Sequence, residues 1–242
     1  MTPTALTSRT QAPTDRIAGW MPAGMLDWPG RLTSTVFLSG CSLRCPFCHN
    51  PSLLGAQSED AKWSDLESYL RAKRDWLDGV VVTGGEPTDD PCIVTLLETL
   101  ANLGYEVKLD TNGTNPETLE TLLAMGLVSH VALDVKTVLD RYDALVDRPG
   151  TSMRVERTIT LLRRSGVSHE FRTTAYPGAL EIDDFLVIAE MLRGGKLYAI
   201  QQFVPRTTLD PRAGTVVPFR PDALHDIASQ CARHLPTIVR GA

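Results

Sequence analysis

Six short apolar segments alternate with amphipathic segments along the chain, and this alternation constrains the fold more than any other feature of the sequence. The apolar segments cover residues 33–40, 79–86, 106–113, 130–136, 170–176 and 197–204. They are β-branched or apolar, as expected of strands that are buried on both faces. Helical periodicity follows them in residues 63–77, 90–103, 116–125, 152–165, 183–194 and 221–235.

Strands that all lead into helices in one direction predict a parallel sheet with helices outside it. Six such units are too few for a closed eight-unit barrel, so we expect an α/β fold with an open, partial (βα)6 barrel. A flat, doubly wound sheet is the alternative. Helix-end signals support the assignment: a capping box at Ser64 and Glu67, Pro116 and Pro221 at helix starts, and Gly104, Gly126 and Gly166 at helix ends.

Length and composition set the class of protein. The chain has 242 residues, which one domain over residues 17–242 can accommodate after a polar, disordered lead-in over residues 1–16. The formal net charge is −5, and no run of Lys and Arg points to a nucleic-acid partner. No apolar stretch approaches the roughly 20 residues of a membrane span. We therefore expect a cytoplasmic protein whose thiols stay reduced.

Polar and glycine-rich residues gather at the carboxyl ends of the predicted strands, where parallel sheets carry their functional sites. These residues are Cys41, Cys45 and Cys48 after the first strand, Gly84–Pro87, Asp110–Gly113, Asp134 and Lys136, Arg172 and Thr173, and Gln201 and Gln202. If they served only as turns, they would be equally common at the amino ends. The sequence therefore predicts one site at this edge.

Three cysteines within eight positions suit an iron–sulfur cluster better than zinc. A structural zinc site needs four ligands, and His49 is adjacent to Cys48, where both side chains seldom reach one tetrahedral ion. Cys92 or Cys231 could supply the fourth ligand, but both lie in helical patterns typical of small buried residues. A [4Fe–4S] cluster held by three thiolates keeps one iron open for a small molecule.

The motif C-x-x-x-C-x-φ-C, with Phe47 at the aromatic position, resembles the signature of the radical S-adenosylmethionine (SAM) enzymes. Gly84-Gly85-Glu86-Pro87 resembles the GGEP element of that family. The resemblance implies that the three cysteines are the catalytic cluster ligands and that Phe47 lies beside the adenine. It also implies that Gly84, Gly85 and Glu86 meet the amino group of SAM.

The run MLDWPGRLTSTVFLSGCSLRCPFCHNPSL is similar to the N-terminus of glycyl-radical-enzyme activases, and most like the activating proteins of anaerobic ribonucleoside-triphosphate reductase. That resemblance implies a glycyl-radical enzyme as partner and an electron donor such as flavodoxin or ferredoxin. It implies a cofactor pocket that includes Asp110, Thr111, Asn112, Asp134 and Lys136. In related activases, the counterparts of Asp110, Thr111 and Asp134 hold a monovalent cation, and the counterpart of Arg172 holds the glycyl peptide.

Two departures and two alternatives accompany this hypothesis. Residues 203–206 lack the histidine that formate-lyase activases carry there. The short span between Cys48 and Gly84 leaves no room for a ferredoxin-like insertion, so we predict a single cluster. One alternative is a radical SAM enzyme for a small molecule, similar to 7-carboxy-7-deazaguanine synthase. The other is a non-catalytic protein, either an iron–sulfur carrier or a zinc-stabilised module.

Overall fold

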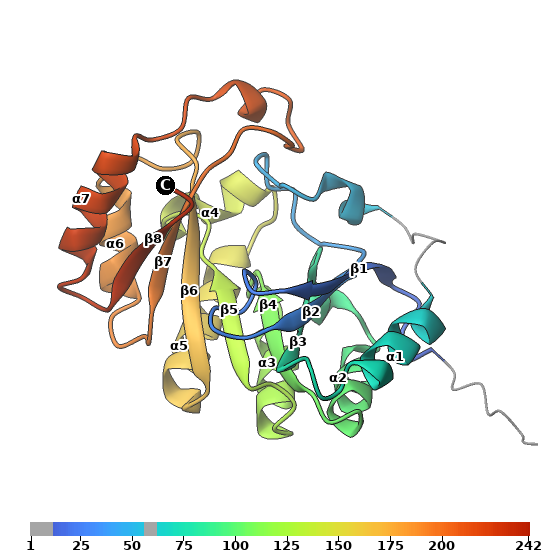
Figure 1. Ribbon diagram of the computed structural model, residues 1–242. Helices are drawn as coiled ribbons and strands as arrows, with labels where there is room; N and C mark the ends of the chain where they lie inside the picture. The colour runs from blue at the N-terminus through green and yellow to red at the C-terminus, as the bar shows by residue number, and fades with distance from the viewer. Residues whose placement is uncertain (1–11, 56–61) are drawn as a thin grey trace, which may run out of the picture.

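One eight-stranded sheet organises the chain. The computed structural model describes residues 12–55 and 62–242 (Figure 1). Neighbouring strands follow the order of the sequence. The strands are β1 (Ile17–Gly24), β2 (Thr33–Leu38), β3 (Gly79–Gly84), β4 (Glu106–Thr111), β5 (His130–Asp134), β6 (Ser168–Ala175), β7 (Tyr198–Gln202) and β8 (Thr237–Arg240). Strands β2 to β8 pair in parallel, and β1 pairs with β2 in the antiparallel sense.

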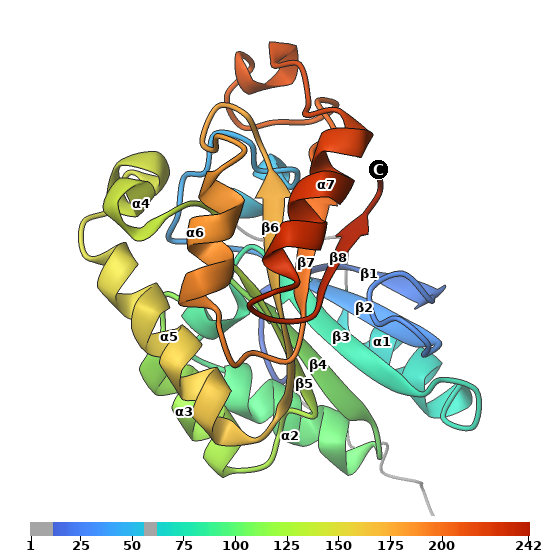
Figure 2. The ribbon, with the colours of Figure 1, turned by 90° about the vertical axis from the view of Figure 1, so that its left-hand side faces the viewer.

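The helices lie on the outer face of this sheet, as Figures 1 and 2 show. They are α1 (Trp63–Ala72), α2 (Ile93–Asn102), α3 (Pro116–Ala124), α4 (Leu139–Val146), α5 (Thr151–Ser165), α6 (Asp184–Met191) and α7 (Pro221–Cys231). Three 3-10 turns lie in connections that lead from a strand to a helix. They are η1 (Pro51–Leu54), η2 (Pro87–Asp89) and η3 (Ala213–Thr215). Within the described residues no pairing joins β1 to β8. The sheet is therefore an open, partial barrel, and the fold class predicted from the sequence is confirmed.

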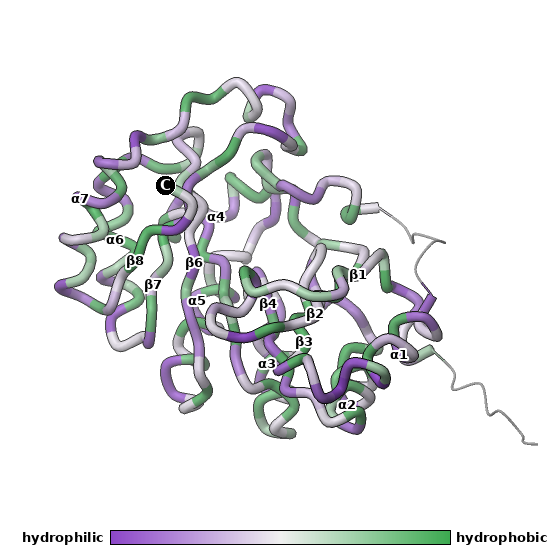
Figure 3. The backbone as a smooth tube through the Cα atoms, viewed as in Figure 1, coloured by the Kyte–Doolittle hydropathy of each residue, from purple (hydrophilic) through white to green (hydrophobic). Residues whose placement is uncertain are grey.

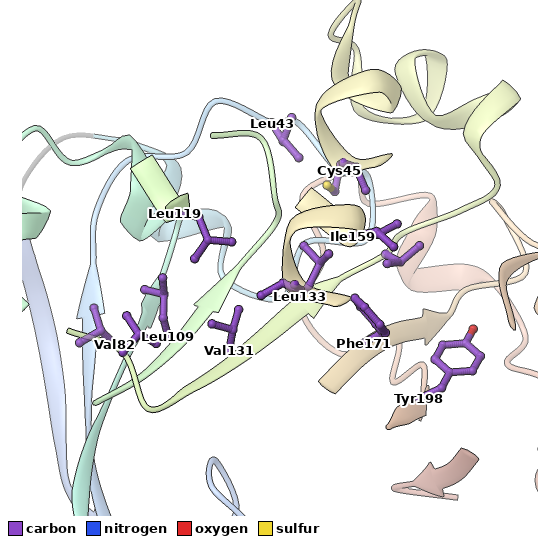
Figure 4. Packing of buried hydrophobic residues seen from close by; sticks show 14 of the residues in the cluster. Leu43, Cys45, Val82, Leu109, Leu119, Val131, Leu133, Ile159, Phe171 and Tyr198 are labelled. Atoms are coloured by element: carbon purple, nitrogen blue, oxygen red, sulfur yellow. The ribbon is translucent and has the colours of Figure 1, made fainter. Parts of the chain in front are cut away.

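A single apolar core lies between the sheet and its helices. Figure 3 shows the hydrophobic segments running along the central strands, as their predicted burial requires. In Figure 4, Val82, Leu109, Val131 and Leu133 of successive strands stand in this layer with Leu119 of α3 and Ile159 of α5. Leu43 and Cys45, in the loop after β2, also belong to this core. Their buried side chains therefore anchor that loop to the rest of the protein.

The helix-end predictions have mixed outcomes. Gly104, Gly126 and Gly166 follow helix ends with φ of 88°, 68° and 75°, a backbone region that favours glycine, as expected. Pro116 and Pro221 begin α3 and α7, as expected. The capping box is wrong, because α1 begins at Trp63 and Lys62 is its N-cap. The hydroxyl of Ser64 instead donates to Asp65, and Glu67 forms an ion pair with Arg71.

The predicted lead-in falls largely on residues 1–11, which lie outside the described residues. Residues 12–16 make defined contacts. Thr14 is buried and its hydroxyl donates to Asp90 Oδ2 at 2.6 Å. Arg16 Nη1 donates to the carbonyl of Asp89 at 3.1 Å, and the carbonyl of Arg16 accepts from Ser39 N. This segment therefore ties the end of β2 to the η2 turn. Among the described residues, no helix has both the length and the apolar character needed to cross a bilayer.

Candidate active site

A cavity of about 400 Å³ opens at the carboxyl ends of the parallel strands. Every residue expected to bind the cluster, SAM or the glycyl peptide lines it, except Glu86. Those that do are Cys41, Cys45, Phe47, Cys48, Gly84, Gly85, Asp110, Thr111, Asn112, Asp134, Lys136 and Arg172. Of the other strand-end residues, Gln201 lines it, and Pro87, Gly113, Thr173 and Gln202 do not. Parallel strands bring their carboxyl ends to one edge, so residues far apart in sequence meet here.

The cysteine loop follows β2 and is fixed at several points. Leu43, Cys45 and Phe47 are buried, whereas Cys41 and Cys48 are half-buried. Three backbone hydrogen bonds hold the loop, from Gly40 N to Leu53 O (2.7 Å), from Arg44 N to Val146 O (3.3 Å) and from Asp210 N to Pro46 O (2.9 Å). The loop held in this way brings Cys41, Cys45 and Cys48 to the cavity wall.

The thiols of Cys41 and Cys45 lie in an environment that disfavours free thiolates. Burial raises the pKa of Cys41 to about 11, and burial also raises the pKa of Cys45. The ammonium group of Lys136 acts in the opposite direction on both pKa values. Two donors approach the sulfur of Cys41, namely Leu43 N at 3.4 Å and Asn112 Nδ2 at 3.7 Å. A bound metal would displace the thiol protons, because only the thiolate is a ligand.

The glycines at the end of β3 allow that strand to touch the cysteine loop. A Cβ on Gly85 would lie 2.1 Å from the carbonyl oxygen of Gly40 and 3.2 Å from Cys41 Cβ. Gly84 has a φ of 125°, and a Cβ there would lie 2.2 Å from Leu38 O. Both residues also line the cavity. Glycine is therefore required here for contact with β2 and its loop, in addition to any contact with a ligand.

Glu86 does not line the cavity. Its carboxylate is 1% exposed and accepts hydrogen bonds from the main chain and hydroxyl of Thr88 (3.0 and 2.6 Å). It also accepts from Thr111 Oγ1 (2.7 Å) and Asn112 N (2.6 Å). Burial raises the pKa of Glu86 to about 7, although these four donors act to lower it. Glu86 thus positions the loop after β4, and the contact of this carboxylate with the amino group of SAM stays a prediction.

Five charged side chains form a layer across the cavity wall. Arg172 lies between two carboxylates, with Nη1 2.8 Å from Asp110 Oδ2 and Nε 2.8 Å from Asp134 Oδ1. Lys108 is fully buried and pairs with Asp110, and Lys136 Nζ is 3.6 Å from Asp134 Oδ2. Three positive groups therefore face two negative groups.

The ion pairs in this layer favour the ionised forms of Asp134 and Lys136. Burial alone would raise the pKa of Asp134, but Arg172 and Lys136 lower it below its usual value. Burial would lower the pKa of Lys136, but the carboxylate of Asp134 raises it above its usual value. The net charge of this layer is thus +1, which suits an anionic ligand.

Aromatic rings form another part of the wall. Phe47 packs on Tyr176 with ring centroids 4.9 Å apart, and Tyr176 packs on Phe203 at 5.0 Å. The His49 ring is stacked with Phe203 at 5.9 Å, and both His49 and Asn50 line the cavity. Burial lowers the pKa of His49, so its imidazole is neutral near pH 7. Phe47 therefore has a packing role and also lines the cavity.

The residues fit an iron–sulfur cluster with an open iron. The donors are three thiols beside a cation, and the hydroxyl of Ser42 in the same loop is buried without a protein partner among the described residues. Within residues 12–55 and 62–242, no three His, Cys, Asp or Glu side chains converge as ligands of a single ion. A cubane does not require such convergence, because each thiolate binds a different iron.

Several residues in and beside the cavity were not predicted as site residues. Asp27 lines the cavity, and its Oδ2 accepts from Thr35 Oγ1 at 2.6 Å. Lys108 is fully buried and does not line the cavity, but it pairs with Asp110, which does. Lys108 and Asp110 alternate by two on β4, which places both on one face of the strand, so that spacing was an available signal. Asp27 lies in a loop, and its sequence neighbours carry no comparable signal.

Comparison with known proteins identifies relatives. A family model described as the Radical SAM superfamily matches residues 35–192. A protein of Methanocaldococcus jannaschii, provisionally named as a glycyl-radical enzyme activating enzyme, is 29% identical over 233 residues, which are 92% of this chain and 94% of that protein. The 7-carboxy-7-deazaguanine synthase of Aquifex aeolicus is 39% identical over 77 residues, which are 32% of this chain and 34% of that enzyme.

The fold has solved counterparts. The crystal structure of Streptococcus suis SuiB bound to the precursor peptide SuiA superposes with a TM-score of 0.64 at 15% identity. The match covers 84% of this chain and 48% of SuiB, so this chain spans about half of that protein. The likeness supports the partial-barrel architecture described above.

Proposed function

The chain belongs to the Radical SAM superfamily, and from this premise we propose that it generates a glycyl radical on a partner enzyme. As a member of this superfamily, the chain is an enzyme that uses an iron–sulfur cluster and SAM. The observation that carries the finer proposal is the cavity itself, where three thiols, two close-packed glycines and a cationic layer meet. The full-length similarity to the Methanocaldococcus protein supports the same activity.

The roles of the residues follow from their positions. Cys41, Cys45 and Cys48 would hold a single [4Fe–4S] cluster. When bound, the cluster and SAM would supply the radical chemistry that removes a hydrogen atom from a glycine Cα of the partner. The positive layer of Lys136 and Arg172 would attract the carboxylate of SAM. Glu86 would act indirectly, because it fixes the loop that carries Asn112.

The aromatic and glycine residues would complete the cofactor pocket. Phe47 would offer its ring to the adenine, and Gly84 and Gly85 would offer backbone groups to the amino end of SAM. The cavity walls exclude water from the reacting centre once the cofactor is bound. We also propose that residues 17–242 act as one catalytic unit and that the protein works in the cytoplasm, where buried thiols stay reduced.

The partner and the electron donor are the finer parts of the proposal. We favour anaerobic ribonucleoside-triphosphate reductase as the partner, because the N-terminal motif resembles the activating proteins of that enzyme. One electron must come from outside the chain for each SAM that is cleaved, and flavodoxin or ferredoxin is the class of donor we propose. Arg172 is the proposed contact for the glycyl peptide, although in this structure its guanidinium pairs with Asp110 and Asp134.

A monovalent cation beside Asp110, Thr111 and Asp134 is also part of the proposal. In this structure Arg172 bridges the two aspartates, so it occupies the region between their carboxylates. A cation could enter only if Arg172 moved away, for example toward an incoming peptide. The proposed cation site therefore implies two positions for Arg172.

The small-molecule alternative is less well supported. Its synthase relative matches only 32% of this chain, so the similarity is confined to a part of it. The radical SAM family covers both kinds of enzyme, and only the product of hydrogen transfer separates them.

The test uses anaerobically reconstituted protein with SAM and dithionite. We expect 5′-deoxyadenosine and methionine in equal amounts, and a glycyl EPR doublet when anaerobic ribonucleoside-triphosphate reductase is added. Cys48→Ala should abolish cleavage, whereas Cys92→Ala should leave it unchanged. Cys92 is exposed at the N-cap of α2, so the expectation that it is buried was wrong. Failure of the wild type to cleave SAM would contradict the cofactor roles. Cleavage without a glycyl radical on the reductase would contradict this choice of partner.

A further inference from the structure

Lys108 is a charged residue that the proposed roles leave unexplained. Its side chain is fully buried on β4, and its ammonium group forms an ion pair with the carboxylate of Asp110. Lysine is almost never fully buried unless it is paired. Replacing a buried ion pair by apolar groups is often neutral for stability, so stability alone does not explain a lysine at this position. Lys108 does not line the cavity, so any role in ligand binding must be indirect.

A row of ion pairs leads from Lys108 to the cavity. Lys108 binds Oδ1 of Asp110, and Oδ2 of the same carboxylate lies 2.8 Å from Arg172 Nη1. Arg172 Nε lies 2.8 Å from Asp134 Oδ1, and Asp134 Oδ2 lies 3.6 Å from Lys136 Nζ. The last four of these five residues line the cavity. Lys108 is therefore connected to the cavity wall through Asp110.

The four members of the row that line the cavity have no net formal charge. The carboxylates of Asp110 and Asp134 balance the cations of Arg172 and Lys136, so these residues alone would form a neutral wall. Lys108 adds one positive charge on the side of Asp110 that faces away from the cavity. The surplus of one positive charge in the layer thus depends on a residue outside the wall.

The neighbours of Lys108 on the inner face of the sheet do not supply this charge. His130 lies opposite Lys108 on β5. Burial lowers the pKa of His130 to about 4, and Lys108 also lowers it, although Glu170 acts to raise it. The imidazole is therefore neutral near pH 7. Arg240 is committed to the carboxylate of Glu170 through two hydrogen bonds of 3.1 and 2.7 Å.

The positive charge is available to a ligand at Lys136. Its Nζ lies 3.6 Å from Asp134 Oδ2, which is longer than a hydrogen bond, so this contact leaves the N–H donors of the ammonium group for a ligand. Arg172, by contrast, donates through Nη1 and Nε to the two aspartates. Lys136 is therefore the cation of the row that is better placed to donate to an anionic group.

We propose that Lys108 is a positioning residue for the carboxylate end of SAM. It neutralises Asp110 from the side away from the cavity, and this leaves the charge of Lys136 for the ligand. The inference rests on the proposed function, in which Lys136 and Arg172 attract that carboxylate. Lys108 acts through Asp110 and makes no contact in the cavity.

The experiment measures the Kd for SAM of the anaerobically reconstituted protein by titration calorimetry. No reductant is added, so SAM is not cleaved and binding is measured in place of activity. Lys108→Met keeps a long unbranched side chain and removes the charge, and it should raise the Kd for SAM about tenfold. Lys196→Met is the matched control. It removes a positive charge at an exposed position before β7 and should leave the Kd unchanged.

Decarboxylated SAM is the control ligand, because it lacks the anionic group and keeps the rest of the molecule. Lys108→Met should bind this ligand at least as tightly as the wild type does, since a positive wall does not attract it. A defect in folding or in cluster loading would weaken the binding of both ligands. An equal loss of affinity for SAM and for decarboxylated SAM would therefore overturn the proposal.

A double variant, Lys108→Met with Asp110→Asn, tests whether charge is the cause. It loses one cation and one anion together, so the row regains its surplus of one positive charge and no buried charge is left without its partner. The asparagine oxygen can still accept from Arg172. The Kd for SAM should therefore return toward the wild-type value. If the double variant binds SAM as weakly as Lys108→Met does, the proposal is wrong.

Failure of this inference and failure of the proposed function give different results. If the wild type and Lys108→Met bind SAM equally well, Lys108 has no part in recognition, while the proposed function stands. If the wild type does not bind SAM, the proposed cofactor roles fail and the role of Lys108 fails with them.

Discussion

At the scale of single residues, Glu86 determines where the loop after β4 lies relative to β3. Its carboxylate accepts from Asn112 N at 2.6 Å and from Thr111 Oγ1 at 2.7 Å, across the gap between the two strand ends. Asn112 in turn directs its amide to the sulfur of Cys41. A buried acid thus connects the glycine-rich turn, the β4 loop and the cysteine loop.

This acid should make stability depend on pH. The pKa of Glu86 is about 7 in the folded protein and 4.5 without burial, so the native state binds the proton more tightly. Its stabilising effect is complete below pH 4.5 and is lost as the pH rises toward 7. The free energy of unfolding should fall by about 3 kcal/mol across this window.

Glu86→Gln is the matched control for that dependence. The variant cannot titrate at this position, and its amide NH2 would face a backbone or hydroxyl donor, so it should be less stable by about 1–3 kcal/mol at low pH. Urea unfolding of the cluster-free chain at several pH values gives the difference between wild type and variant. A difference that stays constant or grows with pH would show that Glu86 is ionised throughout.

Arg172 should compete with any cation at the two aspartates. In Arg172→Gln the guanidinium no longer lies between Asp110 and Asp134, so their carboxylates are free to attract a cation. We expect the variant to bind K⁺ at least about tenfold more tightly than the wild type, measured by titration calorimetry. Arg212→Gln, at an exposed ion pair, is the control and should change nothing. Equal K⁺ affinity in Arg172→Gln and wild type would exclude a cation site here.

The sequence predicts site residues whose type and spacing indicate their role. It does not predict a role that depends on the orientation of the side chain. Three cysteines at fixed spacing and a Gly-Gly pair after a strand indicate a site through residue type and spacing alone. Glu86 belongs to the same motif, yet its carboxylate turns to Thr88, Thr111 and Asn112. That choice depends on donors from another strand. Sequence spacing contains no information about such a rotamer.

At the scale of elements, the six β-strands and six helices expected from periodicity are present, and the elements missed have weak local signals. β1 contains Gly19, Pro22 and Gly24 and pairs irregularly with β2. Glycine and proline are unfavourable in strands, and proline is tolerated only at edges, where β1 lies. The sequence analysis also missed β8, which has only four residues, and α4, which follows β5 closely. Tertiary pairing, rather than propensity, creates these strands.

The contact between β3 and the cysteine loop should depend on glycine. In Gly85→Ala the new methyl group would lie 2.1 Å from Gly40 O, so the two segments must separate. We expect a loss of about 1–3 kcal/mol in the free energy of unfolding and a lower iron content after reconstitution. Gly55→Ala is the control, because a Cβ there has no described neighbour within 4 Å. Full iron loading of Gly85→Ala would mean that the cysteine loop tolerates the displacement.

At the scale of the whole molecule, parallel topology assembles the site. β2 to β7 each deliver a side chain or loop to one cavity: Phe37, Gly84, Asp110, Asp134, Arg172 and Gln201 all line it. The sequence predicted this convergence because the direction of each strand follows from the β-then-α order. The antiparallel β1 could not be predicted, because its glycines and proline give no strand signal and its place follows from pairing with β2.

A ligand that contacts so many strand ends should stabilise the whole fold. SAM at about 100 times its dissociation constant should add about 2.7 kcal/mol to the unfolding free energy of the cluster-loaded protein. For a domain of this size that corresponds to a rise in Tm of about 5–11 °C, measured by anaerobic scanning calorimetry. Cys48→Ala should show a much smaller rise, because it removes a proposed ligand of the cluster to which SAM would bind. An equal rise in both proteins would mean that SAM binds the cavity walls without the cluster, and the open iron would then have no part in recognition.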